Sequence, residues 1–251
     1  MALSFILLFT TVLFLYRPEP NFKGKSLTDW AQQFGSNRWS GRRELAREAQ
    51  TSVCQIGSRG VPFLLDKMQA KDNRFKKKMR ETLPGTWHAN LGLKDTSPAI
   101  RRAGAHGLAA LGTNAPPDVV PNLIEIATTH PEEDGRYIAV FALRNLGSVS
   151  EPAIPFLIGC LTNRTDIIRE ESAVGLGVIG RQPEIVVPAL MRYLESARTS
   201  PTSFEARGAI SALRNFGTNA RPAIPLVRSF FHHEREDIRQ AATNTLLIID
   251  P

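Results

Sequence analysis

Cysteine is nearly absent from this chain of 251 residues, in which only Cys54 and Cys160 occur. Two cysteines cannot form the disulfide framework of a small secreted domain, and neither stands in the Cys-x-x-Cys or Cys/His spacing of a zinc site. We expect both side chains to be small buried apolar groups. A Ser-His-Asp order, a phosphate-binding P-loop and a GxGxxG pattern are missing as well. The sequence therefore predicts a protein that is not an enzyme and holds no cofactor or metal.

Lysine is scarce in the last two thirds of the chain, where Lys94 is the only one after Arg80. Segment 17–81 contains 15 Lys and Arg against 7 Asp and Glu, a balance of +8, whereas 82–251 contains 16 against 17, a balance of −1. The hydrophobic share of 42% is that of a globular protein with a sizeable core. Since phosphate contacts dominate the affinity of proteins for nucleic acids, the near-neutral remainder argues against a nucleic-acid partner.

Charged side chains are absent from the first 16 residues, MALSFILLFTTVLFLY. This run 1–16 predicts a hydrophobic N-terminal helix that anchors the protein in a membrane. A signal peptide is the alternative, because the run is shorter than the ~20 residues that span a bilayer. Arg17, Lys23 and Lys25 follow, so the positive-inside rule favours a cytoplasmic body over a secreted or periplasmic one. We expect 17–40 to be a basic juxtamembrane linker, either a plain tether or a cap helix.

Two stretches of the chain are nearly identical: ALRNLGSVSEPAIP begins at Ala142 and ALRNFGTNARPAIP begins at Ala212. They belong to a longer series in which a glycine follows an apolar residue at gaps of 55, 35, 33 and 37 positions: Gly57, Gly112, Gly147, Gly180 and Gly217. A proline follows each glycine, with gaps of 59, 34, 33 and 37: Pro62, Pro121, Pro155, Pro188 and Pro225. Because the two series move together, a whole unit is repeated along the chain.

Each unit contains two helical patterns. Before each glycine, apolar and small side chains recur at spacings of three and four, as on one face of an α-helix, for example at Ala139, Leu143 and Leu146. The glycine suits the end of this helix, where a left-handed conformation is common. The proline suits the first turn of the next helix, where its missing N–H costs nothing. Ser97 and Asp166 suit helix starts.

Helix pairs of 33 to 37 residues with a proline in one helix resemble HEAT repeats, including the HEAT-like repeats of phycobilisome lyases. An arginine also recurs at one position of the second helix: Arg101, Arg136, Arg169 and Arg239. The resemblance covers 41–251 and implies an all-α fold, a right-handed α-solenoid of about five to six helix pairs in which each unit packs only on its neighbours. It also implies that these arginines form structural contacts between units and bind no ligand.

One unit is lengthened by a basic insertion at about 66–97. Phe75, Met79 and Leu83 recur at every fourth position, which predicts a short amphipathic helix, followed by a loop with Trp87. The basic residues around this apolar stripe are Lys71, Arg74, Lys76, Lys77, Lys78 and Arg80. We interpret them as a patch that contacts anionic lipid at a membrane surface. A nucleic-acid patch, and a solvated helix whose apolar side packs on the solenoid, are the alternatives.

HEAT-type proteins with other activities have features that this sequence lacks. Hydroxylases of the deoxyhypusine type hold iron with several His-Glu pairs, whereas His233-Glu234 is the only such pair here. Nothing in the sequence singles out a bilin pocket of the lyase type. HEAT-like DNA glycosylases are basic solenoids with aromatic residues around the lesion. A nucleic-acid-binding or base-processing solenoid that uses the basic N-terminal third therefore stays the alternative function.

When the repeat units are aligned, the residue types at equivalent positions on the outward side of the second helix differ from unit to unit. In HEAT-type solenoids this helix usually lines the concave surface. These variable positions contain our candidate partner-binding face, which consists of Arg102, His106, Tyr137, Phe141, Arg144, Arg207 and Arg214. Aromatic and arginine side chains are typical of interaction hot spots. The sequence thus predicts a non-catalytic, membrane-tethered scaffold that binds another protein on its concave face.

Overall fold

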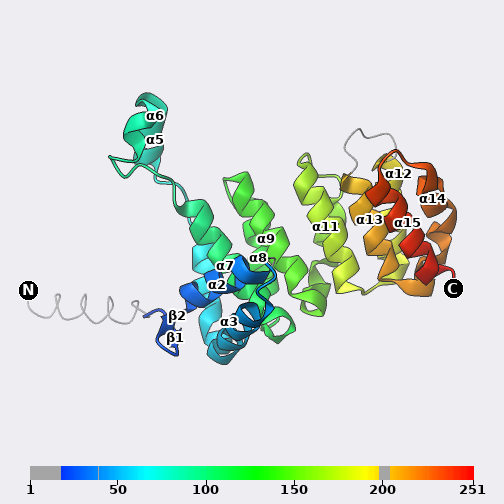
Figure 1. Cartoon of the computed structure of the whole chain (residues 1–251), viewed down its shortest axis with the longest axis horizontal. Coiled ribbons are helices and arrows are strands. Elements are labelled where there is room, and N and C mark those ends of the chain that lie inside the picture. Colours follow the sequence, from blue (N-terminus) through cyan, green and yellow to red (C-terminus); the bar gives the residue numbers. More distant parts are fainter. Residues whose placement is uncertain (1–17, 39, 198–203) are drawn as a thin grey trace, which may run out of the picture.

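The computed structural model describes residues 18–38, 40–197 and 204–251, and nearly all of their regular structure is helical (Figure 1). The predicted all-α fold is therefore confirmed, whereas the hydrophobic run 1–16 lies outside the described residues. Within the three described ranges, no helix has the length and apolar character that crossing a membrane requires. The predicted membrane location with a single N-terminal anchor is corrected accordingly, since no described helix supports it.

Six helix pairs follow one another in a single row along the described chain (Figure 1). They are α2 (Leu27–Arg38) with α3 (Arg43–Ile56), α4 (Val61–Met68) with α7 (Ser97–Leu111), α8 (Val119–Thr129) with α9 (Glu133–Asn145), α10 (Ile154–Cys160) with α11 (Asp166–Ile179), α12 (Pro183–Ala197) with α13 (Phe204–Arg214), and α14 (Ile224–Arg228) with α15 (Glu236–Ile249). The second helix of each pair packs on that of the next, from α7 through α9, α11 and α13 to α15. This stacking is the arrangement expected of a solenoid.

The core runs through the whole row as one continuous apolar cluster. It contains the leucine that stands four positions before the repeat glycine in successive units, and this column is fully buried: Leu108, Leu143, Leu176 and Leu213. Each helix of the six pairs buries the face on which its apolar residues recur and leaves the opposite face to solvent or to a neighbour. Burial of this one column therefore stabilises every unit against the next.

The turns between pairs explain the glycine and proline series. All five repeat glycines have φ between 52° and 64°, a left-handed conformation that favours glycine. Short 3-10 turns begin at four of these glycines, and a fifth turn lies inside the last pair: η1 (Gly57–Gly60), η2 (Gly112–Asn114), η3 (Gly147–Ala153), η4 (Gly217–Ala223) and η5 (Ser229–His232). Pro62, Pro155 and Pro225 stand in the first turn of their helices, as predicted. Pro188 instead lies inside α12, because that helix already begins at Pro183.

Contacts between units were expected of the recurring arginines, and Arg101 pairs with Glu132 and Asp134 of the next unit. The other three join the two helices of their own pair. Arg136, Arg169 and Arg239 each donate from Nη1 to the main-chain oxygen six residues earlier, over 2.7, 2.6 and 2.6 Å. This oxygen lies in the turn between the first and the second helix. The arginines therefore stabilise the turn by satisfying a carbonyl group that has left the helical hydrogen-bond pattern.

The residue six positions before each arginine has a second role in the same turn. Its side chain accepts a hydrogen bond from the N–H group two residues further on, at the start of the second helix. The acceptors are Asp95, His130, Asn163 and His233, at 2.9, 3.1, 3.0 and 3.1 Å. One polar side chain thus closes the turn that leads into the second helix in four of the six pairs, which is a repeat feature that our sequence analysis did not identify.

Two segments add to the row of pairs. At the N-terminal end, β1 (Asn21–Phe22) and β2 (Lys25–Ser26) form a small antiparallel hairpin, and α2 packs on both α3 and α7. Between α4 and α7, the short helices α5 (Arg74–Thr82) and α6 (Gly85–His88) stand off from the row, at the top of Figure 1. We call residues 71–95 the arm.

Candidate functional site

The predicted partner-binding residues lie on one row of helices. Arg102 and His106 belong to α7, Tyr137, Phe141 and Arg144 to α9, and Arg207 and Arg214 to α13. We call this surface the second-helix face. Helix α11 lies between α9 and α13 and so separates the two ends of the face. Its Glu170 and Val174 pack against Gly208 of α13.

Helix α2 covers the N-terminal end of this face. Gly35 lies so close to the His106 ring that a Cβ at position 35 would be 1.9 Å from Nδ1. The His106 ring also meets the Phe141 ring edge-on, with centroids 6.0 Å apart. At the end of α2, the Arg38 guanidinium lies over the Phe34 ring, 5.5 Å from its centroid. His106 is therefore half-buried between three helices, whereas we had expected an open surface.

Positive charge gathers around His106. Burial lowers the pKa of His106, and the charges of Arg38 and Arg102 lower it further, so the imidazole is neutral at neutral pH. Burial and then the Arg144 charge also lower the pKa of Arg38. We call this group the basic–aromatic cluster; it consists of Phe34, Arg38, Arg102, His106, Phe141 and Arg144. The positive charges of the cluster attract carboxylates, and its aromatic rings offer apolar surface for planar groups.

Arg144 connects two units. Its Nη1 donates to both carboxylate oxygens of Glu171 on α11, at 3.1 and 2.9 Å, in a largely buried ion pair. Beside it, burial raises the pKa of Tyr137, and the charge of Glu171 raises it further, so the phenol stays protonated. Arg144 is therefore engaged inside the molecule, while Tyr137 presents a half-buried ring and a hydroxyl donor on the face.

The C-terminal end of the face is an open polar hollow of about 240 Å³ between α13 and α15. Arg207 and Arg214 line one side and Asp237 and Asn244 line the other. The Nε atom of Arg207 is 4.0 Å from the carboxylate of Asp237, and both side chains are substantially exposed. An ion pair of this kind in water contributes little to stability, so Arg207 can exchange it for an external carboxylate.

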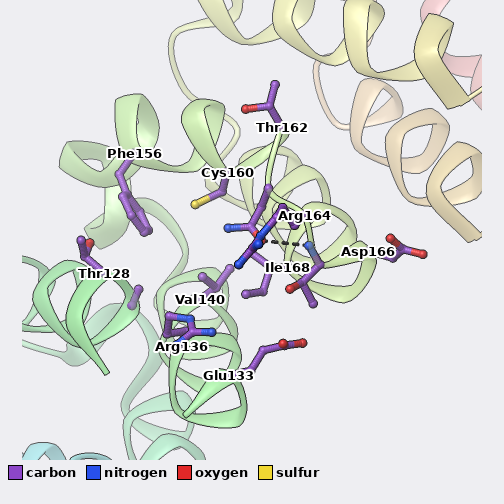
Figure 2. A pocket seen from close by; sticks show the side chains of 13 residues that line it. Thr128, Glu133, Arg136, Val140, Phe156, Cys160, Thr162, Arg164, Asp166 and Ile168 are labelled. Atoms are coloured by element: carbon purple, nitrogen blue, oxygen red, sulfur yellow. Dashed lines mark hydrogen bonds between the residues drawn. The ribbon is translucent and has the colours of Figure 1, made fainter. Parts of the chain in front are cut away.

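A second hollow, which our sequence analysis missed, lies at the turns between helices. This groove of about 1060 Å³ is formed by α8, α9, α10 and the start of α11. Figure 2 shows the charged Arg136 and Arg164 beside the apolar Val140 and Phe156, with the Cys160 thiol in the wall. Burial raises the pKa of Cys160, so its thiol is protonated and weakly nucleophilic at neutral pH. The groove is therefore suited to binding rather than to covalent chemistry.

The six cations predicted as a surface patch all belong to the arm and its base. Two of them are used inside the arm: Lys76 Nζ donates to the oxygen of Gly92 at 3.0 Å, and Arg80 donates to the oxygen of Leu93 at 2.6 Å and pairs with Asp72. The other four are Lys71, Arg74, Lys77 and Lys78. The apolar stripe does not pack on the solenoid, because α5 buries none of its residues. The lipid interpretation depended on the membrane anchor, and the described helices do not support it.

Histidine and carboxylate side chains do not gather into a metal centre in the part of the chain that the structure describes. His233, of the His-Glu pair, accepts from the N–H of Arg235 and stacks on the Phe230 ring, with centroids 6.0 Å apart. His130 occupies the equivalent place in another pair. Both histidines therefore belong to the repeated turn.

Comparison with known proteins agrees with the helix pairs. Residues 135–163 match the family model of the PBS lyase HEAT-like repeat, so this segment, which spans α9, η3 and α10, is similar to such a repeat. No curated protein matches the chain.

Solved structures resemble the chain to different degrees. A mutant of Kap121p is similar with a TM-score of 0.51 and 14% identity over 89% of this chain and 26% of that one. The complex of CpcE and CpcF of phycocyanin lyase from Nostoc sp. PCC7120 gives 0.49 and 23% identity over 64% of each chain. A designed armadillo repeat protein in complex with the peptide (KR)4 gives 0.46 and 15% identity over 90% of this chain and all of that one. At these identities the likeness concerns the fold alone.

Proposed function

We propose that the protein is a HEAT-repeat scaffold without catalytic activity, and that it binds another protein through the second-helix face. The observation that supports this proposal is the basic–aromatic cluster, in which Arg38 and Arg102 lie near His106 and the His106 ring meets the Phe141 ring, at the junction of α2, α7 and α9. Arginine and aromatic side chains dominate the energetics of protein interfaces. The cluster therefore has the composition of an interaction hot spot.

The length of the face suits a protein partner better than a small ligand. It extends over four consecutive second helices, α7, α9, α11 and α13. Packed helices lie about 8–10 Å apart, so the face is roughly 25–30 Å long. An extended segment or a helix of a partner could contact the cluster at one end and the hollow beside Arg207 at the other. Stacked repeats generally present extended binding surfaces of this kind.

The proposal is tested by crosslinking from defined positions of the face. A photoreactive amino acid is placed at Arg102 or Ser211, which are exposed on α7 and α13, and as a control at Arg221, which is exposed on the turn η4. After irradiation in the native cell, mass spectrometry identifies the crosslinked protein. We expect one partner from both face positions and none from the control. Equal crosslinking from all three positions would contradict the proposal.

Binding of the purified partner then provides the quantitative test. The triple variant Arg102→Ala, Tyr137→Ala, Arg207→Ala removes side chains from both ends of the face but keeps the Arg144–Glu171 ion pair. We expect its affinity for the partner to fall by about tenfold or more. The matched control Arg221→Ala should bind as the parent does. An unchanged affinity of the triple variant would show that the partner binds elsewhere.

A further inference from the structure

The arm presents apolar side chains that no other part of the described chain covers. Phe75 is 71% exposed, Trp87 56% and Leu91 49%, and neither α5 nor α6 contains a buried residue. Single exposed apolar residues are common on protein surfaces, but three large ones within one short segment indicate a contact surface. Figure 1 shows the arm standing clear of the row of helix pairs, so a partner could approach it without touching the second-helix face.

Internal bonds hold the arm in this shape. The Asn73 side chain accepts from the N–H groups of Phe75 and Lys76 and so caps α5. Lys76 and Arg80 donate to the oxygens of Gly92 and Leu93 and so tie α5 to the returning segment. The exposure of the apolar residues is therefore built into the fold of the arm.

The base of the arm is equally well fixed. The Leu93 side chain is buried at 3% exposure. The N–H of Asp72 donates to the carboxylate of Glu132 at 3.0 Å, which joins the arm to the next helix pair. The arm thus presents its surface from a firm attachment, which lowers the entropy lost on binding.

Four cations accompany the exposed apolar residues. Lys71, Arg74, Lys77 and Lys78 form no hydrogen bond or ion pair through their side chains with any residue that the structure describes. On α5, Arg74, Lys77 and Lys78 stand at positions i, i+3 and i+4, which places them on one side of the helix. Phe75 and Met79, four positions apart, lie on the adjacent side. The arm therefore presents an apolar strip with a row of positive charge along its edge.

We propose that the arm binds an acidic amphipathic helix of a partner protein. The apolar side of that helix would cover Phe75 and Met79, and its carboxylates would pair with Lys77 and Lys78. Both halves of this ligand are required by the arm: apolar surface to cover the exposed rings, and negative charge to balance the cations. This interaction is separate from the one that we propose for the second-helix face.

Nucleic acid fits the arm less well. A phosphate backbone requires a run of available cations, but Glu81 stands four positions after Lys77 and three after Lys78, on the same side of α5. Lys76 and Arg80 are already engaged within the arm. A phosphate backbone would also leave Phe75 and Met79 uncovered, whereas an amphipathic helix covers these apolar side chains while its carboxylates pair with the cations.

The test uses the full chain and three fluorescent probes in anisotropy titrations. The first probe is a synthetic peptide held helical by a side-chain staple, with leucine at the a and d positions of each heptad and glutamate at the others. In the second probe glutamine replaces every glutamate, and the third is a DNA oligonucleotide. The variants are Phe75→Ser with Trp87→Ser, which removes the apolar contact, and Lys77→Glu with Lys78→Glu, which reverses the charge. Arg42→Glu with Arg43→Glu, both exposed at the start of α3, is the matched charge control.

We expect the Glu/Leu peptide to bind the full chain and the control, and to bind each arm variant about tenfold or more weakly. The Gln/Leu peptide should bind weakly to all of them. Because α5 and α6 bury no residue, circular dichroism should show unchanged helicity in the variants. Three outcomes would overturn the proposal: peptide affinity equal in parent and arm variants, equal affinity for the two peptides, or tighter binding of DNA that does not depend on Phe75.

Discussion

The guanidinium of Arg101 donates from Nη1 to the main-chain oxygen of Ala70, 2.7 Å away and 31 positions earlier in the chain. In the other pairs the equivalent arginine reaches the oxygen six positions back. If the 25 residues of the arm, 71–95, are left out of the count, Ala70 also stands six positions before Arg101. The arm is therefore an insertion into the turn of an ordinary helix pair, and Arg101 closes that turn across the base of the arm.

Replacement of Arg101 by methionine should destabilise the protein strongly. Arg101 is the one arginine of the series that is fully buried, and it also pairs with Glu132 and Asp134 of the next unit. Arg101→Met leaves these groups without their cation, which we expect to cost about 3 kcal/mol in the free energy of unfolding. Arg239→Met, in the exposed last pair, should cost less than about 1 kcal/mol. Urea unfolding of both variants measures the difference, and equal losses would contradict the role given to Arg101.

The Glu132 carboxylate should make stability depend on pH. Burial alone would raise its pKa, but the hydrogen bond from Asp72 and the Arg101 guanidinium outweigh burial, so the pKa lies below the ordinary value of 4.5. A carboxylate whose pKa is lowered in the folded state stabilises the protein above the pKa of the unfolded state. This contribution is lost as the pH falls below 4.5 and through the folded pKa.

Glu132→Gln isolates this contribution. The variant keeps an acceptor for Asp72 but has no charge for Arg101, so its free energy of unfolding should change less with pH than that of the parent. Other carboxylates titrate in both proteins and cancel in the difference. Urea unfolding measured from neutral pH downward gives both curves, and parallel curves through the acidic range would refute the assignment.

The helix pairs could be predicted from the sequence because the signals are local. Glycine at the end of one helix, proline at the start of the next and apolar residues at spacings of three and four do not depend on distant contacts. Ser97 and Asp166 begin α7 and α11, as their residue types indicated. A polar residue also recurs in the sequence six positions before each arginine, but only the hydrogen bonds of the structure reveal its role in the turn.

The site could be predicted only in part, because distant segments complete it. The helical spacing placed Tyr137 and Phe141 on one face, but nothing in it shows that α2 crosses α7 and adds Phe34 and Arg38. The pairing of Arg144 with Glu171 likewise depends on how closely α9 and α11 approach. The stripe of the arm predicted an amphipathic helix correctly, but a pattern of spacing does not indicate whether its apolar side is covered.

Excision of the arm should leave a folded protein. Deletion of 71–95 places Ala70 six positions before Arg101, as His130 stands before Arg136, and Ala70→Asn supplies the capping acceptor that Asn163 provides in its own turn. We expect this shortened chain to keep the helicity and the unfolding cooperativity of its pairs. Its free energy of unfolding should fall by only about 1–2 kcal/mol, for the lost burial of Leu93 and the lost bond to Glu132.

A control distinguishes the repaired turn from a generally tolerant loop. The same deletion made one residue longer, over 71–96, moves Ala70 to five positions before Arg101 and takes the acceptor out of reach of the arginine. We expect this variant to be measurably less stable than the repaired one in thermal and urea unfolding. If both deletions are equally stable, the six-residue spacing has no structural role.

Two glycines in helices should respond to alanine with opposite signs. A Cβ at Gly177 of α11 would lie 2.6 Å from the Cα of Ala212 on α13, and the main chain of a packed helix cannot move aside easily. Gly177→Ala should therefore destabilise the protein by about 1–3 kcal/mol. At Gly159 of α10, a Cβ meets nothing within 4 Å. Because alanine loses less backbone entropy on folding than glycine does, Gly159→Ala should stabilise the helix by about 0.5–1 kcal/mol. Urea unfolding decides both signs, and a neutral Gly177→Ala would mean that α11 and α13 are not in close contact.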